Sequence, residues 1–121
     1  MAGRFNETIP IYLQIIEDIK FRILSGVYKT DDKIPAVRDL ALEYGVNPNT
    51  VQKAFTELER DGLLQSRRTS GRYVTIDSEK IEQMKKEASC SYIRDLFEKM
   101  NRIGISNEET KKIIGEWEDQ E

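Results

Sequence analysis

The short connection at residues 45–47, between two predicted helices, restricts the fold of this chain more than any other feature. Residues 36–44 have the apolar spacing of a short amphipathic helix. Gly45 is expected to end that helix, because glycine enters the left-handed conformation without a steric penalty. Asn47 is a good N-cap for the next helix, and Pro48 suits its first position. So short a link between two helices predicts a helix-turn-helix.

The segments on either side extend this motif into a larger domain. Apolar residues recur every three or four positions from Ile11 onward, which predicts a helix that ends near residues 25–26. After the helix-turn-helix, residues 63–65 and 73–76 are predicted to be extended, with a hairpin tip at residues 67–72. The expected fold is therefore mainly α with a small β-hairpin (α+β). The predicted buried stripe of the third helix consists of Val51, Ala54, Phe55 and Leu58. Residues 1–76 are expected to form a winged helix-turn-helix domain.

Residues 77–121 are predicted to form two helices. Apolar residues step by three or four from Ser78 for about seven turns, and Ser106 with Glu109 matches the capping box of a second, short helix. The long helix would pack either on its own domain or against the same helix of a second copy. A helix of about 24 residues is about 36 Å long, longer than the small domain it would cover. We therefore expect residues 77–121 to be a dimerisation segment that makes an isologous homodimer.

Composition excludes several classes of chemistry. The 121 residues include no histidine and one cysteine, Cys90. Ser-His-Asp and Cys-His catalysis and histidine-ligated zinc are therefore excluded, and one cysteine forms neither an internal disulfide nor a metal cluster. We expect no enzyme activity, no cofactor and no metal. Cys90 is expected to be a small core or interface residue, with a redox sensor as the alternative.

The sequence also gives an expected location. No stretch approaches about 18 apolar residues, and the N-terminus has no apolar signal core. We expect a cytoplasmic protein with no membrane partner. The net charge of −3 neither requires nor forbids a nucleic-acid partner, because screening confines electrostatic attraction to about 8–10 Å.

The start of the third helix supplies the side chains that a reader of duplex DNA needs. Its side-chain amides can form two hydrogen bonds with an adenine, and its hydroxyl and ammonium groups can bind bases or phosphates. These residues are Asn47, Asn49, Thr50, Gln52 and Lys53. The same set also fits an ordinary solvated helix face, so this pattern alone leaves both interpretations open.

Arginines before and after that helix favour a polyanionic partner. Arg38 starts the second helix, where it would bind a phosphate or a base, or else pair with a neighbouring carboxylate. Residues 62–76 contain no acid, and Ser70 and Gly71 permit a close approach at the hairpin tip. The arginines of this tip are Arg67, Arg68 and Arg72. A basic hairpin suits a narrow minor groove, although charge on an edge hairpin also prevents aggregation. The succession of helix-turn-helix and basic wing favours DNA binding.

Three sequence runs resemble the winged-helix domain of GntR-family transcription regulators. They are KIPAVRDLA at residues 33–41, GVNPNTVQKA at 45–54 and LERDGLL at 58–64. The form NPNTVQK, the opening IPIYLQI at residues 9–15 and the short C-terminal tail are similar to the YtrA subfamily in particular.

The resemblance implies a bacterial cytoplasmic homodimer that binds a palindromic operator in double-stranded DNA, usually as a repressor and often of transporter genes. The DNA contacts that it implies are Arg38, then Asn47, Asn49, Thr50, Gln52 and Lys53, and finally Ser70, Gly71 and Arg72 at the wing tip. Two positions depart from the common pattern. Pro48 replaces an arginine found in many relatives, and Thr69 replaces the first glycine of the usual Gly-x-Gly wing. The tail is too short for the effector-binding domain of larger relatives, so no small-molecule effector is specified.

Two other classes of function are alternatives to DNA binding. A winged-helix scaffold also serves as a protein-interaction adaptor without DNA, because fold does not fix function. An enzyme is the poorer alternative. Its candidate carboxylates, Glu108 and Glu109, lie at a helix start, where acids stabilise the helix dipole without any catalysis.

Overall fold

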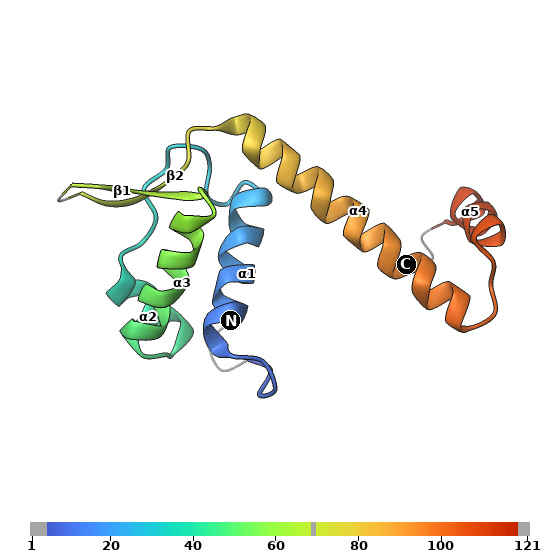
Figure 1. Cartoon of the computed structure of the whole chain (residues 1–121), viewed down its shortest axis with the longest axis horizontal. Helices are drawn as coiled ribbons and strands as arrows, with labels where there is room; N and C mark the ends of the chain where they lie inside the picture. Colours follow the sequence, from blue (N-terminus) through green and yellow to red (C-terminus); the bar gives the residue numbers. More distant parts are fainter. Residues whose placement is uncertain (1–4, 69, 119–121) are drawn as a thin grey trace. The chain divides into compact units, whose positions relative to one another are not determined.

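The computed structural model describes residues 5–68 and 70–118, and Thr69 lies outside the described residues. Within these ranges the chain forms five helices and one two-stranded sheet (Figure 1). The elements are α1 (Ile11–Leu24), α2 (Val37–Tyr44), α3 (Pro48–Arg60), β1 (Leu64–Arg67), β2 (Gly71–Val74), α4 (Ser78–Arg102) and α5 (Asn107–Glu116). The chain divides into two compact units, residues 1–82 and residues 83–121. The division falls inside α4.

The predicted helix-turn-helix is confirmed. Gly45 has the left-handed conformation (φ +71°) that ends α2. The Asn47 side-chain oxygen accepts a hydrogen bond from the Asn49 backbone N–H at 2.8 Å, and Pro48 is the first residue of α3. The glycine and the cap together reverse the chain within three residues, which fixes α3 against α2.

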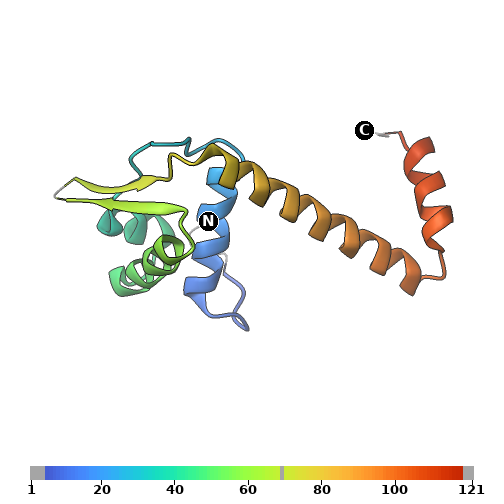
Figure 2. The ribbon, with the colours of Figure 1, turned by 45° about the horizontal axis from the view of Figure 1, so that its top comes forward.

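The core of the first unit lies between the three helices and the sheet. Its α3 side is the predicted stripe of Val51, Ala54, Phe55 and Leu58, all buried. Isoleucines of α1 and Leu40 of α2 complete it. Figures 1 and 2 show α1 and α3 side by side, with the hairpin at one edge of the helices. Burial of one face of α3 leaves its opposite face to solvent.

The strands of the wing reach further toward its tip than the sequence predicted, and β2 ends at Val74 rather than at Ile76. β1 and β2 pair antiparallel, with Leu64 opposite Val74 and Arg67 opposite Gly71. Arg67, Gly71 and Arg72 therefore belong to the strands and not to the tip. The predicted tip at residues 67–72 is therefore too long, because the strand pairing continues to Arg67 and Gly71. Gly71 is the first residue of β2, and its φ of +104° is a conformation that glycine adopts without strain.

The segment before α2 pairs with β2, on the edge of that strand that does not face β1. A β-bridge joins Lys33 to Tyr73. The Asp31 N–H donates to the Val74 carbonyl at 3.1 Å, and the Val74 N–H donates to the Asp32 carbonyl at 2.8 Å. The sequence of this segment indicates only a polar turn. Its backbone hydrogen bonds attach the wing to the loop between α1 and α2.

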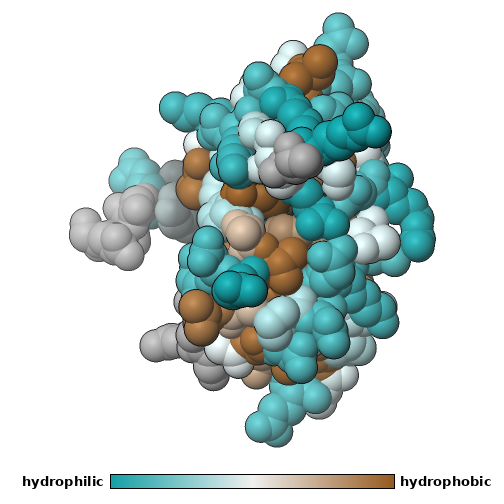
Figure 3. Space-filling model, turned by 90° about the vertical axis from the view of Figure 1, so that its left-hand side faces the viewer, coloured by the Kyte–Doolittle hydropathy of each residue, from teal (hydrophilic) through white to brown (hydrophobic). Residues whose placement is uncertain are grey.

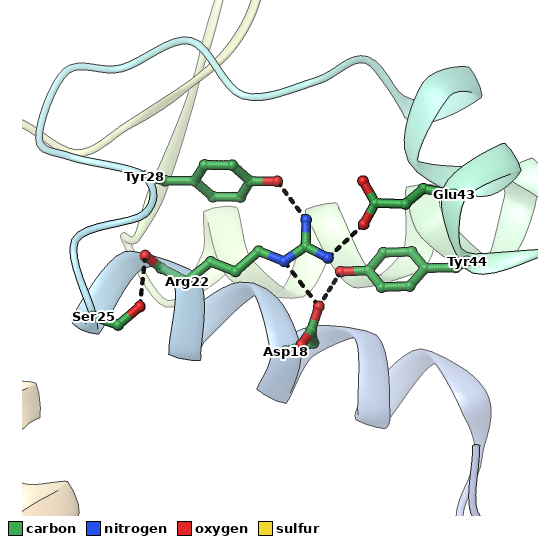
Figure 4. A network of polar contacts seen from close by, with 6 residues as sticks. All are labelled: Asp18, Arg22, Ser25, Tyr28, Glu43 and Tyr44. Atoms are coloured by element: carbon green, nitrogen blue, oxygen red, sulfur yellow. Dashed lines mark hydrogen bonds and ion pairs between the residues drawn. The ribbon is translucent and has the colours of Figure 1, made fainter. Parts of the chain in front are cut away.

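A polar network joins α1 to the end of α2 (Figure 4). Arg22 forms an ion pair with Asp18, in which Nε lies 3.0 Å from the carboxylate. It donates hydrogen bonds from Nη1 to the Tyr28 hydroxyl at 2.8 Å and from Nη2 to Glu43. The buried Tyr44 hydroxyl donates to Asp18 at 2.7 Å. Burial raises the pKa of Tyr44, and the hydrogen bond to Asp18 raises this pKa further. Tyr44 therefore remains a neutral donor that holds α2 against α1.

Replacing Tyr44 by phenylalanine is expected to lower the free energy of unfolding by about 1–1.5 kcal/mol, because the hydrogen bond to Asp18 is lost while the ring stays buried. Urea unfolding followed by circular dichroism measures the change as a lower midpoint at constant slope. Tyr73→Phe is the matched control, because the Tyr73 hydroxyl makes no hydrogen bond within residues 5–68 and 70–118. Equal losses in both variants would contradict the role given to Tyr44.

The second unit contains most of α4 and all of α5. The Ser106 hydroxyl oxygen accepts from the Glu109 N–H at 3.1 Å, as the predicted cap requires, and the buried Thr110 hydroxyl donates to the Ser106 carbonyl at 2.8 Å. Large apolar side chains of this unit, which include Ile93 and Trp117, are exposed in the single chain. None of the described helices combines the length and the apolar character that crossing a bilayer requires.

Candidate nucleic-acid interface

The exposed face of α3 carries most of the residues predicted to read DNA. Asn49, Gln52 and Lys53 are exposed and Thr50 is half-buried, on the side opposite the buried stripe. The oxygen of the Asn47 side chain is engaged as the cap of α3, which leaves its NH₂ group as a donor. The amides of Asn49 and Gln52 keep both donor and acceptor groups for a base edge.

Tyr12 of α1 contributes to this face, although no sequence pattern assigned it a role in DNA binding. The Lys53 ammonium lies 3.9 Å from the centre of the Tyr12 ring, within the range of a cation–π contact. Tyr12 and Lys53 line an open pocket of about 390 Å³ together with Asn49 and Thr50. The ring restricts where the ammonium group lies beside the start of α3. A tyrosine at α1 meets this lysine only because the two helices pack together.

Arg38 lies at the start of α2 and is exposed. It makes no ion pair with any residue in the ranges 5–68 and 70–118, and the nearby Glu43 pairs with Arg22 instead. The alternative that Arg38 pairs with an adjacent carboxylate is therefore not observed among the described residues. Its guanidinium is available to a phosphate or a base.

The three wing arginines have different surroundings. Arg67 forms an ion pair with Asp31 and lies 3.9 Å from the centre of the Tyr73 ring. Arg72 forms an ion pair with Glu59 of α3. Arg68 is exposed and has no ion-pair partner in the part of the chain that the structure describes. The predicted absence of acids holds for the hairpin sequence but not in space, because the fold brings Asp31 and Glu59 to it.

The remaining predicted wing residues, Ser70 and Gly71, are exposed beside Arg68. A side chain at Gly71 would approach Lys33, since a Cβ there would lie 3.4 Å from the lysine Cε. The face of the first unit that carries α2 and the wing is mostly hydrophilic, with a few apolar side chains between polar ones (Figure 3). The structure thus places the predicted residues in three groups, on α2, on α3 and on the wing.

A polar α3 face beside a basic hairpin defines a winged helix-turn-helix protein. The family model of GntR bacterial regulatory proteins matches residues 11–74. The chain belongs to the GntR family of bacterial regulatory proteins.

Relatives and solved structures agree with this family. The chain is 32% identical over 109 residues to the HTH-type transcriptional regulator YhcF of Bacillus subtilis, covering 90% of each protein. It is 46% identical over 70 residues to the HTH-type transcriptional repressor YtrA of B. subtilis, which is 58% of this chain and 54% of YtrA. These relatives are transcription regulators, and within the family the chain is a winged-helix regulator of the YtrA type.

The likeness extends to three dimensions. A GntR family transcriptional regulator from Listeria monocytogenes superposes with a TM-score of 0.85 at 33% identity, covering 94% of this chain and all of that structure. The AraR DNA-binding domain in complex with operator ORX1 superposes with a TM-score of 0.55 at 34% identity, covering 62% of this chain and 92% of that structure. The first likeness spans both units of the chain, and the second spans 62% of it.

Proposed function

We propose that this chain binds a palindromic DNA operator in the bacterial cytoplasm as a homodimer and represses transcription. The observation that carries the proposal is the exposed amide-bearing face of α3, opposite its buried stripe. YtrA is a repressor, and AraR is a similar winged-helix domain bound to its operator. Both relatives support DNA binding by this chain.

Each group of residues receives a role from its chemistry. Asn49 and Gln52 would read base edges in the major groove, because their amides pair with adenine. Contacts that fix the register on the duplex would come from Arg38, Asn47, Thr50 and Lys53. The wing residues Arg67, Arg68, Ser70 and Gly71 would follow the adjacent minor groove, where arginine is attracted by the negative potential.

The homodimer is proposed from the apolar stripe of α4. The stripe has the three- and four-residue spacing of one helix face, and its members after Ile81 are Met84, Ala88, Tyr92, Leu96, Met100 and Ile103. Tyr92, Leu96 and Ile103 are 69%, 39% and 72% exposed in the single chain. A second copy would bury this face and relate two α3 helices by a two-fold axis, which matches a palindromic site.

The roles of Gln52 and Arg38 predict different losses. Gln52→Ala should reduce the discrimination between bases at one operator position by about 1–3 kcal/mol of binding free energy, because it removes a base contact. Arg38→Ala should weaken binding to all sequences and make the salt dependence shallower by about one phosphate contact. Fluorescence anisotropy with the DNA upstream of the chain's own gene, and with single-base variants of it, measures both effects at several salt concentrations.

Arg94→Ala is the control for Arg38→Ala. Arg94 is an exposed arginine of α4, so its removal changes the net charge equally. It should leave the affinity and the salt dependence unchanged. If wild-type binding were independent of salt, or if Gln52→Ala and Arg38→Ala weakened all duplexes equally, the proposed roles would be wrong.

A further inference from the structure

We propose that Glu59 and Arg72 position the wing on α3, and that Arg72 acts through this contact rather than by binding DNA. The proposal rests on the proposed function, because it divides the wing arginines between two tasks. It also departs from the sequence prediction that Arg72 is a DNA contact.

One carboxylate bonds to both strands of the wing. Oε1 of Glu59 accepts a hydrogen bond from Nε of Arg72, and Oε2 accepts one from the Ser66 hydroxyl at 3.0 Å. Ser66 and Arg72 are register partners in the antiparallel pair, on β1 and β2. Glu59 thus attaches α3 to both strands at the same position along the wing.

The guanidinium of Arg72 is directed toward the core. It lies 5.0 Å from the centre of the ring of Phe55, which is one turn before Glu59 on α3 and is buried. The side chains of Arg72 and Glu59 are only 21% and 29% exposed. A partly buried pair is screened less by salt than an exposed one. Arg68, by contrast, is exposed at the tip and has no ion-pair partner among the described residues.

The two possible roles of Arg72 predict opposite effects of neutralising Glu59. If Arg72 contacts a phosphate, Glu59 competes with the DNA for it, so Glu59→Gln should tighten binding. If Glu59 holds the wing, the same variant should weaken binding. A wing that is mobile in the free protein loses more conformational entropy when it is ordered on the duplex. The sign of the change therefore separates the roles.

The experiment compares Glu59→Gln, Arg72→Gln and the double variant, with the DNA upstream of the chain's own gene as the probe. We expect each single change to weaken binding about threefold to tenfold and the double change to weaken it no further, as for two residues that act as one unit. The slope of affinity against salt should stay that of the wild type. Arg68→Gln should lower that slope by about one phosphate contact.

A measurement without DNA keeps this inference separate from the proposed function. Amide hydrogen exchange should accelerate in residues 64–67 and 71–74 of Glu59→Gln, while the amides of α1 keep their protection. If wild-type protein binds no duplex, the proposed function fails, yet the exchange still tests the attachment of the wing. Tighter binding of Glu59→Gln, a lower salt slope of Arg72→Gln, or unchanged exchange in the wing would overturn the inference.

Discussion

Replacing Phe55 by alanine is expected to lower the free energy of unfolding by about 3–5 kcal/mol, a large part of the total for a domain of this size. Phe55 is 1% exposed, and it belongs to the α3 stripe that packs in the core of the first unit. The shorter side chain leaves a cavity that the surrounding helices fill only in part. Urea unfolding at a fixed protein concentration measures the loss.

The chain provides a matched control in Phe21→Ala. Phe21 is the same residue type on α1 but is 64% exposed. Its removal should change the free energy of unfolding by no more than about 0.5 kcal/mol. Similar losses in the two variants would show that the core of the first unit is not where the structure places it.

Leu96→Glu is expected to convert the proposed dimer into a monomer and to weaken operator binding by about 100-fold or more. A glutamate in the middle of the α4 stripe would place a charge in the apolar interface between two copies. Each monomer would then bind one half-site, without the effective concentration that links two binding units. Sedimentation equilibrium measures the mass, and anisotropy with the upstream DNA measures the affinity.

Ser91→Glu introduces the same side chain on the opposite face of α4, where Ser91 is exposed. This control should keep the mass and the affinity of the wild type. A monomeric wild-type protein, or a Leu96→Glu variant that remains dimeric, would contradict the proposed interface.

Local sequence signals predicted the helices of the first unit with small errors at their ends. The second helix was expected from Ala36, but Ala36 is the extended N-cap and α2 begins at Val37. The third helix ends at Arg60, and Gly62 is left-handed just beyond it. These signals succeed because capping, glycine conformation and apolar periodicity act over a few residues.

The sequence by itself determined the helix-turn-helix, the buried stripe of α3 and therefore the polar face of α3 that is left exposed. Only the tertiary structure decided which of the charged residues are free. It brings Asp31 to Arg67, Glu59 to Arg72 and Tyr12 to Lys53, across 36, 13 and 41 positions of the chain. An ion pair of this kind depends on how helices and strands pack, and no local pattern encodes it. For that reason the hairpin is free of acids in the sequence, while two of its three arginines are paired with carboxylates in the fold.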